Sequence, residues 1–300
     1  MIKNFVKALL PAPVWNALRR FKQYTTARIK IALSMPLKEK IDKIKFEVHL
    51  SEHCNLNCMG CNNFSCIAEP EFVDPDEFKR DFTRMGELFG HVCDRIYLLG
   101  GEPLLNPDII TLMKIARENF TDGNIYVFTN GILLPKKGPE FWTACHDNNI
   151  GILISAYPIK IDIDAIRSLS EKFSVCVNWA WDQQENERNT FHVATINLSG
   201  DSSIPVNFYM CTRGNQCITL SHGRLFTCTF APHVHHFNKF FGQHIEITEA
   251  DYINIYSDIT SDEILNRLRE PIPACRYCVT AKPSRKFTWG LTRKDIHEWL

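Results

Sequence analysis

Residues 46–61 read FEVHLSEHCNLNCMGC, an apolar run followed at once by three cysteines within eight residues. The run Phe46 to Leu50 predicts a buried strand, so Cys54, Cys58 and Cys61 fall on the loop that leaves it. Three thiolates at this spacing can hold three irons of a [4Fe-4S] cluster and leave the fourth iron open. Zinc suits the same ligands, but zinc sites normally pair one C-x-x-C with a second knuckle, whereas here Cys58 belongs to two adjoining spacings.

A second motif follows after one predicted helix and one predicted strand. Arg95 to Leu99 is typical of a buried strand, and it leads directly into Gly100-Gly101-Glu102-Pro103. Two glycines let the backbone turn sharply and approach a neighbour closely. We therefore expect this turn to form part of a ligand site, with the Glu102 carboxylate pointing at the ligand.

Together, the triple-cysteine loop and the Gly-Gly-Glu-Pro turn resemble the radical SAM superfamily. The resemblance implies that Cys54, Cys58 and Cys61 bind a [4Fe-4S] cluster whose open iron chelates the amino and carboxylate groups of S-adenosylmethionine (SAM). It implies that Gly100 to Pro103 contacts the methionyl amino group. In that family, an electron delivered to the cluster cleaves SAM into methionine and a 5'-deoxyadenosyl radical, which abstracts a hydrogen atom from the substrate.

The chain departs from the family pattern just before the third cysteine. The family usually has an aromatic residue there, and this chain has Gly60. Phe64 could take over a contact with the adenine moiety, or it could pack in the core. We interpret Cys66 as a small buried hydrophobe, because a fourth thiolate would close the open iron.

Strands and helices alternate from residue 46 onward, which predicts a parallel sheet with right-handed crossovers. The resemblance implies an α/β fold, a partial (β/α)6 barrel. Asp74, Pro75 and Glu77 predict a capped helix start, with the Glu77 side chain returning to the cap amide. Asn130 and Ser155 follow two strands and are candidate SAM contacts, or turn and strand-end caps. The predicted strands are residues 46–50, 95–99, 124–129, 151–155, 175–179 and 191–198.

Four later cysteines form a second candidate metal site: Cys211, Cys228, Cys275 and Cys278. Between them, residues 218–220 and 224–227 predict a hairpin around Ser221-His222-Gly223, and Thr260 with Glu263 predicts a capping box. This layout resembles the twitch domain, a shortened SPASM domain that carries an auxiliary [4Fe-4S] cluster. Four thiolates would ligate that cluster fully, which suits electron transfer.

Two alternatives remain open in this region. Cys217 could replace Cys211 as a ligand, although the wider interval before Gly223 favours Cys211. The four thiolates could instead form a zinc knuckle. We interpret His233, His235 and His236 as part of a solvated loop, because their spacing is not diagnostic of a metal site.

Charge and composition agree with the expectation of a cytoplasmic enzyme. Lys plus Arg and Asp plus Glu both number 34, which gives no reason to expect a nucleic acid partner. Twelve cysteines without a recognisable signal peptide indicate a reducing compartment. Residues 1–44 carry ten basic residues against Glu39 and Asp42, interleaved with apolar ones. This arm could pack on its own barrel, pack on a partner subunit, or lie on an anionic membrane surface.

The predicted domains are an extension at 1–44, a radical SAM barrel at 45–200, a twitch-like domain at 205–280 and a tail at 281–300. Resemblance to the aminocyclitol dehydrogenases implies oxidation of a sugar-like or cyclitol-like alcohol, with the auxiliary cluster as electron acceptor. The alternatives are modification of a peptide, maturation of another enzyme, and a non-enzymatic metal-stabilised binding protein. The expected partners are a small-molecule or peptide substrate and an electron donor such as flavodoxin or ferredoxin.

Overall fold

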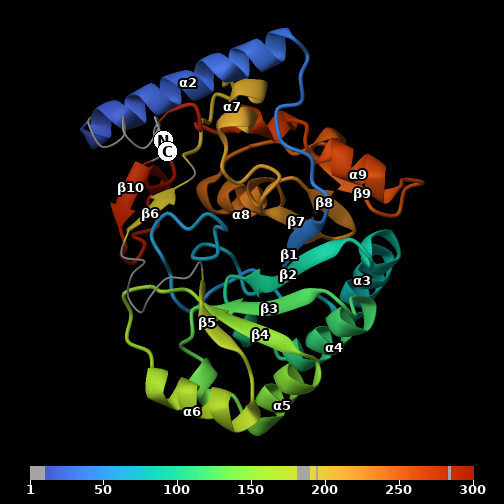
Figure 1. Ribbon diagram of the computed structural model, residues 1–300. Helices are drawn as coiled ribbons and strands as arrows, with labels where there is room; N and C mark the ends of the chain where they lie inside the picture. The colour runs from blue at the N-terminus through green and yellow to red at the C-terminus, as the bar shows by residue number, and fades with distance from the viewer. Residues whose placement is uncertain (1–10, 181–189, 194, 283–284) are drawn as a thin grey trace.

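A central, mostly parallel sheet organises the computed structural model, which describes residues 11–180, 190–193, 195–282 and 285–300 (Figure 1). The sheet order is β5-β4-β3-β2-β1-β7-β8-β9. Four helices cover the outside of its first half in chain order: α3 (Pro75–Phe89), α4 (Ile109–Asn119), α5 (Pro139–Asp147) and α6 (Ile163–Phe173). The strands are β1 (Ile44–Ser51), β2 (Cys93–Gly100), β3 (Asn124–Thr129), β4 (Ile150–Ile154), β5 (Val177–Trp179), β7 (Ile218–Ser221), β8 (Arg224–Phe226) and β9 (Tyr252–Asn254).

Six strands of this sheet run parallel, but the sixth is not the one that we predicted. The five strands β1 to β5 are confirmed, whereas the described residues of the range 191–198 do not continue the sheet. Instead β6 (Thr190–Val193) pairs antiparallel with β10 (Arg285–Thr288), and β7 joins the sheet parallel to β1. A hydrophobic pattern identifies a strand but not the edge that it joins, so the sequence could not distinguish these arrangements.

The two faces of β1 have different surroundings. Phe46 packs against Phe82 and Phe120, with ring centroids 5.8 and 5.7 Å away. Glu47 and His49 belong to the opposite face, because successive side chains of a strand alternate. The same strand therefore anchors the helical layer and presents polar side chains on its other side.

The predicted caps are partly confirmed. Asp74 caps α3 by accepting from the Glu77 N–H at 2.8 Å, and Thr260 with Glu263 forms the capping box of α9 (Ser261–Arg267). The Glu77 side chain, however, does not return to the cap amide. Its Oε1 lies instead 2.7 Å from Nδ1 of His222, in the hairpin turn between β7 and β8, and a carboxylate that pairs with this ring is drawn away from the cap.

The predicted hairpin is confirmed. Ser221 pairs with Arg224, and the two residues between them, His222 and Gly223, have φ values of 50° and 65°. Positive φ at both central positions is what a two-residue turn of type I′ requires.

The prediction of a solvated histidine loop is wrong. The three histidines lie on α8 (Phe230–Phe241), where His233 and His236 are buried and only His235 is exposed. The physical reason is that apolar residues recur at helical spacing along this segment and pack into a second core. These residues are Phe230, Val234, Phe237 and Phe241.

The N-terminal arm forms a long helix, α2 (Ala12–Ala32), that lies across α7 (Ile204–Met210) at the top of Figure 1. Arg20 Nη2 donates to the carbonyl oxygen of Thr280 at 2.8 Å, and Lys30 Nζ lies 5.5 Å from the centre of the Tyr209 ring. The helix thus packs on its own chain, while Lys3 and Lys7 lie outside the described residues. Among the described helices, none is long and apolar enough to cross a membrane.

Candidate functional site

The two sequence motifs meet at the carboxyl end of β1. The Gly101 N–H donates to the Ser51 carbonyl at 2.8 Å, and the Glu102 N–H donates to the His53 carbonyl at 3.1 Å. A Cβ atom on Gly100 would lie 2.2 Å from the Ser51 oxygen, and one on Gly101 would lie 2.1 Å from the His53 oxygen. The paired glycines are therefore needed because this turn runs against the backbone that leads into Cys54.

Glu102 has a different role from the one that we predicted. Its carboxylate is fully buried and accepts from the Leu104 N–H at 3.1 Å, the Thr129 hydroxyl at 2.6 Å and the Asn130 N–H at 2.9 Å. Burial raises the pKa of Glu102, although these hydrogen bonds lower it. The expectation that the carboxylate points at a ligand is corrected: it joins the turn after β2 to the end of β3.

Of the two candidate SAM contacts at strand ends, Asn130 approaches the cysteine loop. Its Nδ2 lies 2.7 Å from Asn55 Oδ1 and 3.8 Å from Cys54 Sγ, and its Oδ1 accepts from the Ile132 N–H. Ser155 is also buried, and its N–H donates to the Thr129 carbonyl. Contact of either residue with SAM stays a prediction.

Two sulfur atoms of the loop have N–H groups close to them. Cys54 Sγ lies 3.4 Å from the Leu56 N–H, in addition to the Asn130 amide. Cys58 Sγ lies 3.2 Å from the indole Nε1 of Trp289. Such N–H groups stabilise negative charge on sulfur, as metal thiolates require.

Cys58 and Cys61 lie near enough to Cys54 to affect its protonation. Burial raises the pKa of Cys54 to about 12, with further contributions from Glu102, Cys61 and Cys58. Thiols with a raised pKa bind metal by exchanging their protons for a cation. The donor set therefore fits a metal-sulfur cluster, with Cys54, Cys58 and Cys61 as the residues that would hold it.

The backbone conformation and close packing at Gly60 explain why this chain lacks the aromatic residue that usually precedes the third cysteine. Its φ is 59°, and a Cβ atom would lie 2.6 Å from Cγ2 of Val193 and 3.2 Å from the Glu298 carbonyl oxygen. Any larger residue would be strained here and would collide with its neighbours. Phe64 does not take the place of the missing aromatic residue, because the Phe64 side chain is buried against Trp299 and α8.

The predicted burial of Cys66 is confirmed. The residue is 4% exposed and belongs to the second core. Burial raises the pKa of its thiol, and the nearby Cys61 raises it further. It therefore lies in the core beside the loop, whereas the three loop cysteines are half-buried.

Residues 289–299 cover the cysteine loop, which sequence reasoning missed. The Met59 N–H donates to the Gly290 carbonyl at 2.8 Å, and the Trp299 indole donates to the Cys61 carbonyl at 2.9 Å. Glu298 Oε2 accepts from the Gly60 N–H at 3.1 Å. Two tryptophans within eleven residues of the predicted tail were the available signal, since large aromatic side chains are usually buried.

The four later cysteines converge on a second site. Cys211, Cys228, Cys275 and Cys278 line one pocket, together with the ring of Phe208 and neighbouring residues. Burial and then the charge of Cys228 raise the pKa of Cys275 to about 12. The four thiols are thus gathered as a ligand set for a metal or cluster would be.

Main-chain groups support this second set of sulfurs. Cys211 Sγ lies 3.2 Å from the Gly214 N–H, and N–H groups at the start of α8 point to Cys228. Asn207 Nδ2 donates to the carbonyl oxygens of Cys275 and Cys278 at 2.9 and 2.5 Å. These contacts hold the thiols in place from several directions.

Cys217 is the alternative ligand that the sequence left open. It does not belong to the residues that line the thiol pocket. Burial raises its pKa to about 12, and the next contribution comes from Glu47 on β1. Cys217 therefore lies toward β1 and not in the thiol pocket. This favours Cys211 as the fourth member of the set.

Residues 48–159, which contain both motifs, match the family model described as the radical SAM superfamily. The match supports the assignment of this segment to the radical SAM superfamily. A segment of this superfamily indicates that the protein is an enzyme. The matched residues extend from β1 to the loop after β4, so the radical SAM segment contains the first thiol set and ends before the second.

Curated relatives match only part of this chain. A probable GTP 3',8-cyclase of Thermoplasma volcanium is 35% identical over 92 residues, which cover 31% of this chain and 27% of that protein. A GTP 3',8-cyclase of Staphylococcus aureus is 30% identical over 126 residues, which cover 39% of this chain and 34% of that protein. The aligned part thus spans about a third or less of each relative.

Solved structures resemble the chain more distantly. BtrN in complex with AdoMet and 2-DOIA is 16% identical, with a TM-score of 0.45, over 76% of this chain and 83% of BtrN. SuiB of Streptococcus suis bound to S-adenosylmethionine is 17% identical, with a TM-score of 0.37, over 48% of this chain and 36% of SuiB.

Proposed function

We propose that this protein is a radical SAM enzyme that oxidises its substrate and passes an electron to an auxiliary cluster. The observation that carries the proposal is the meeting of three thiols with the Gly-Gly turn at the carboxyl end of a parallel strand. With a [4Fe-4S] cluster and SAM bound, this chemistry is reductive cleavage of SAM and abstraction of a substrate hydrogen atom. Cys54, Cys58 and Cys61 would hold that cluster.

The residues around the first site have separate tasks. Gly100, Gly101 and Pro103 shape the turn that would meet the methionyl amino group of SAM, and the buried Glu102 fixes that turn to β3. Asn130 lies beside the same site, because its Nδ2 is 2.7 Å from Oδ1 of Asn55 in the cysteine loop. The segment that covers the loop would limit the access of water to the site.

The second thiol set supports net oxidation rather than simple hydrogen abstraction. Cys211, Cys228, Cys275 and Cys278 would ligate an auxiliary [4Fe-4S] cluster completely, which suits it to accept an electron. A substrate that loses a hydrogen atom and then an electron to this cluster, with loss of a proton, is oxidised by two electrons. An alcohol would thereby become a ketone.

We propose a sugar-like or cyclitol-like alcohol as the substrate, with an external flavodoxin-like or ferredoxin-like donor in a reducing cytoplasm. Each candidate alcohol would be supplied with deuterium on its carbinol carbon, in the presence of SAM and dithionite. Deuterium in the 5'-deoxyadenosine product would identify the substrate class. Transfer from a deuterated peptide instead would establish the alternative, peptide modification, and transfer from a protein would indicate enzyme maturation.

Iron content and SAM cleavage test the two sites separately. Anaerobic reconstitution should give roughly eight irons per chain, four for each [4Fe-4S] cluster. Cys58→Ala should lose about half of the iron and all 5'-deoxyadenosine formation. Cys228→Ala should lose about half of the iron and still form 5'-deoxyadenosine. Zinc in place of iron, with no 5'-deoxyadenosine from the wild type, would overturn the proposal.

Three further variants complete this experiment. Cys66→Ala is the matched control for a thiol beside the first loop, and it should keep the full iron content. Cys211→Ala should lose the second cluster, whereas Cys217→Ala should keep it. Loss of iron in Cys217→Ala alone would reverse the assignment of the fourth ligand.

A further inference from the structure

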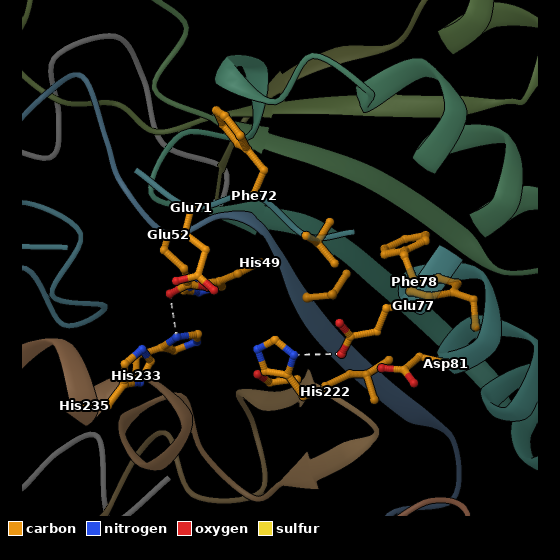
Figure 2. Close-up of a pocket in the computed structure, with 15 residues that line it drawn as sticks. His49, Glu52, Glu71, Phe72, Glu77, Phe78, Asp81, His222, His233 and His235 are labelled. Atoms are coloured by element: carbon orange, nitrogen blue, oxygen red, sulfur yellow. Dashed lines mark hydrogen bonds and ion pairs between the residues drawn. The ribbon is translucent and has the colours of Figure 1, made fainter. Parts of the chain in front are cut away.

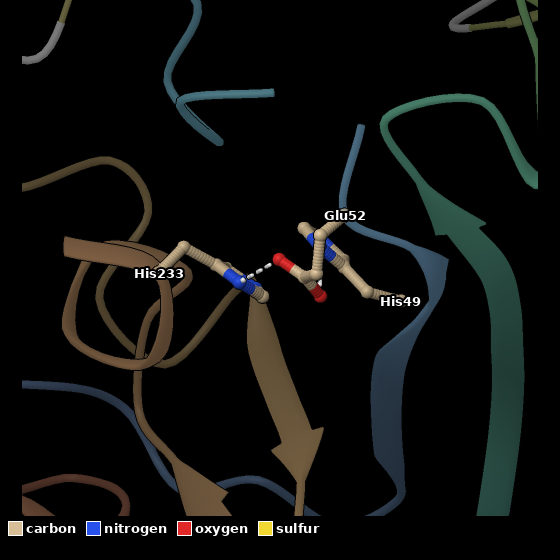
Figure 3. A group of neighbouring side chains, drawn as sticks. All are labelled: His49, Glu52 and His233. Atoms are coloured by element: carbon tan, nitrogen blue, oxygen red, sulfur yellow. Dashed lines mark hydrogen bonds and ion pairs between the residues drawn. The ribbon is translucent and has the colours of Figure 1, made fainter. Parts of the chain in front are cut away.

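Two buried imidazoles and one carboxylate, none of them part of either thiol set, join β1 to α8. Figure 3 shows these three side chains. His49 belongs to β1, Glu52 follows that strand, and His233 comes from α8. Oε2 of Glu52 lies 3.0 Å from Nδ1 of His233, and Oε1 lies 3.2 Å from Nδ1 of His49. The rings of His49 and His233 are stacked, with centroids 3.6 Å apart and planes inclined by 9°.

The ring nitrogens of this group are poorly satisfied by the described residues. The His49 side chain is 3% exposed and that of His233 is 1% exposed. Both nitrogens of His49 and Nε2 of His233 lack a hydrogen-bond partner within the described part of the chain, because the approach of Glu52 to His49 does not have hydrogen-bond geometry. A buried polar group left unpaired is costly, so three such nitrogens on two rings that each approach the Glu52 carboxylate through Nδ1 indicate a ligand.

We propose that His49, Glu52 and His233 bind a divalent transition-metal ion of the zinc class. One ligand atom from each residue lies within 4.8 Å of the others. Bonds of about 2.0–2.2 Å to a shared ion bring such atoms closer than this. One of the two stacked rings would turn out of the stack to aim its nitrogen at the same ion. Two imidazoles and a carboxylate are the protein ligands of many zinc and non-haem iron sites, and they leave coordination positions open.

The protonation of the group agrees with metal binding. Burial lowers the pKa of His233, and the neighbouring His49 lowers it further, which favours the neutral imidazole that metals require. His236 Nε2 lies 2.7 Å from Glu52 Oε2 and would orient the carboxylate as supporting residues do around metal ligands.

The ligands face a pocket, so the ion would not be sealed inside the protein. The same pocket is lined by Glu71, Phe72 and His222, as Figure 2 shows. Open coordination positions on that side could take water or an oxygen ligand of a substrate. The nitrogen and oxygen donors also separate this site from the thiol sets, which favour softer iron-sulfur chemistry.

Zinc itself is the probe that tests the site. The wild type with both thiol sets reconstituted would be equilibrated with Zn²⁺, freed of excess and analysed for metal content and zinc X-ray absorption. We expect about one zinc per chain, coordinated by nitrogen and oxygen only. His233→Ala and Glu52→Gln should lose this zinc. His235→Ala, the neighbouring histidine on the exposed side of α8, should keep it.

The readout does not depend on SAM cleavage, so the metal site can fail while the proposed function stands. Equal zinc in the wild type and His233→Ala, or sulfur among the zinc ligands, would overturn the site. Circular dichroism would verify the fold of each variant. Should His233→Ala fail to fold, His49→Gln and Glu52→Gln preserve side-chain size and decide the result in its place.

Discussion

At Gly60, conformation and close packing act together, and the two effects can be separated. Gly60 and Gly242 both have positive φ, 59° and 61°, but only Gly60 has atoms within 4 Å of an added Cβ. Gly242→Ala should therefore cost only the backbone strain, about 1–2 kcal/mol. Gly60→Ala should cost this and a further penalty of about 1–3 kcal/mol from overpacking against Val193.

Chemical unfolding of both variants measures the difference. The iron content of Gly60→Ala should also fall, because the strained residue lies directly before Cys61. Equal losses of stability in the two variants would show that Val193 and the Glu298 carbonyl move aside without cost.

Asp81 gives the stability of the protein a predictable pH dependence. It accepts from the Gly223 N–H at 2.8 Å and from the Tyr256 hydroxyl at 2.6 Å, and burial raises its pKa despite these hydrogen bonds. A carboxyl with a raised folded-state pKa contributes most stability below its unfolded pKa and loses that contribution as pH rises through the folded value. The unfolding free energy of the wild type relative to Asp81→Asn should thus fall with rising pH.

Urea unfolding between about pH 4 and about pH 8 measures this trend. Glu263 is a control of opposite sign, because hydrogen bonds from Thr260 lower its pKa. Relative to Glu263→Gln, the wild type should lose stability as pH falls. A flat difference between the wild type and Asp81→Asn would contradict the first expectation.

At the scale of elements, the segment after β10 acts on the cysteine loop through Trp289. The indole N–H points to Cys58 Sγ, and N–H groups directed at cluster sulfurs stabilise the reduced state. Trp289→Phe should therefore make the potential of the first cluster more negative, by tens of millivolts. A potentiometric titration followed by electron paramagnetic resonance measures the shift.

Trp299→Phe is the matched control for that experiment. Its indole donates to the Cys61 carbonyl oxygen rather than to sulfur, so this variant also loses one hydrogen bond beside the loop. We expect lower stability but little change in potential. Equal shifts in both variants would mean that general loosening of the segment, rather than the contact with sulfur, sets the potential.

Elements with a local signal could be predicted from the sequence, and their partners could not. The cap at Asp74, the turn at His222 and Gly223, and the strands β1 to β5 follow from local residue types and periodicity. The burial of Glu102 and the packing of Trp289 depend on contacts between residues far apart in the chain. The helix α8 differs from these cases, because its apolar residues recur at helical spacing and are a local signal that the prediction of a loop missed.

At the scale of the whole molecule, α2 turns an apolar face outward. Leu18 is 51% exposed, Phe21 69% and Ile29 58%, and they lie on one side of the helix. Five of its residues are basic and none is acidic. An exposed apolar stripe with basic neighbours suits the surface of an anionic membrane.

Flotation with vesicles tests this surface. The intact chain should float with vesicles that contain phosphatidylserine, less so at high salt, and poorly with neutral vesicles. Phe21→Ser should reduce flotation several-fold, whereas Phe240→Ser, an exposed aromatic residue of α8, should not. Equal flotation of a chain that lacks residues 1–32 would exclude the membrane role of the arm.

The pairing of β1 with β7 has a consequence for electron flow. Cys54 follows the carboxyl end of β1, while Cys228 follows β8, whose last residue pairs with Thr219 opposite Glu47. The four residue-to-residue steps from Glu47 to Ser51 span about 13 Å of strand. One cysteine of each thiol set is therefore mounted on a single hydrogen-bonded frame. With both clusters bound, strand geometry would help to set the gap that an electron must cross. Binding of a substrate can change the driving force across that gap far more easily than its width.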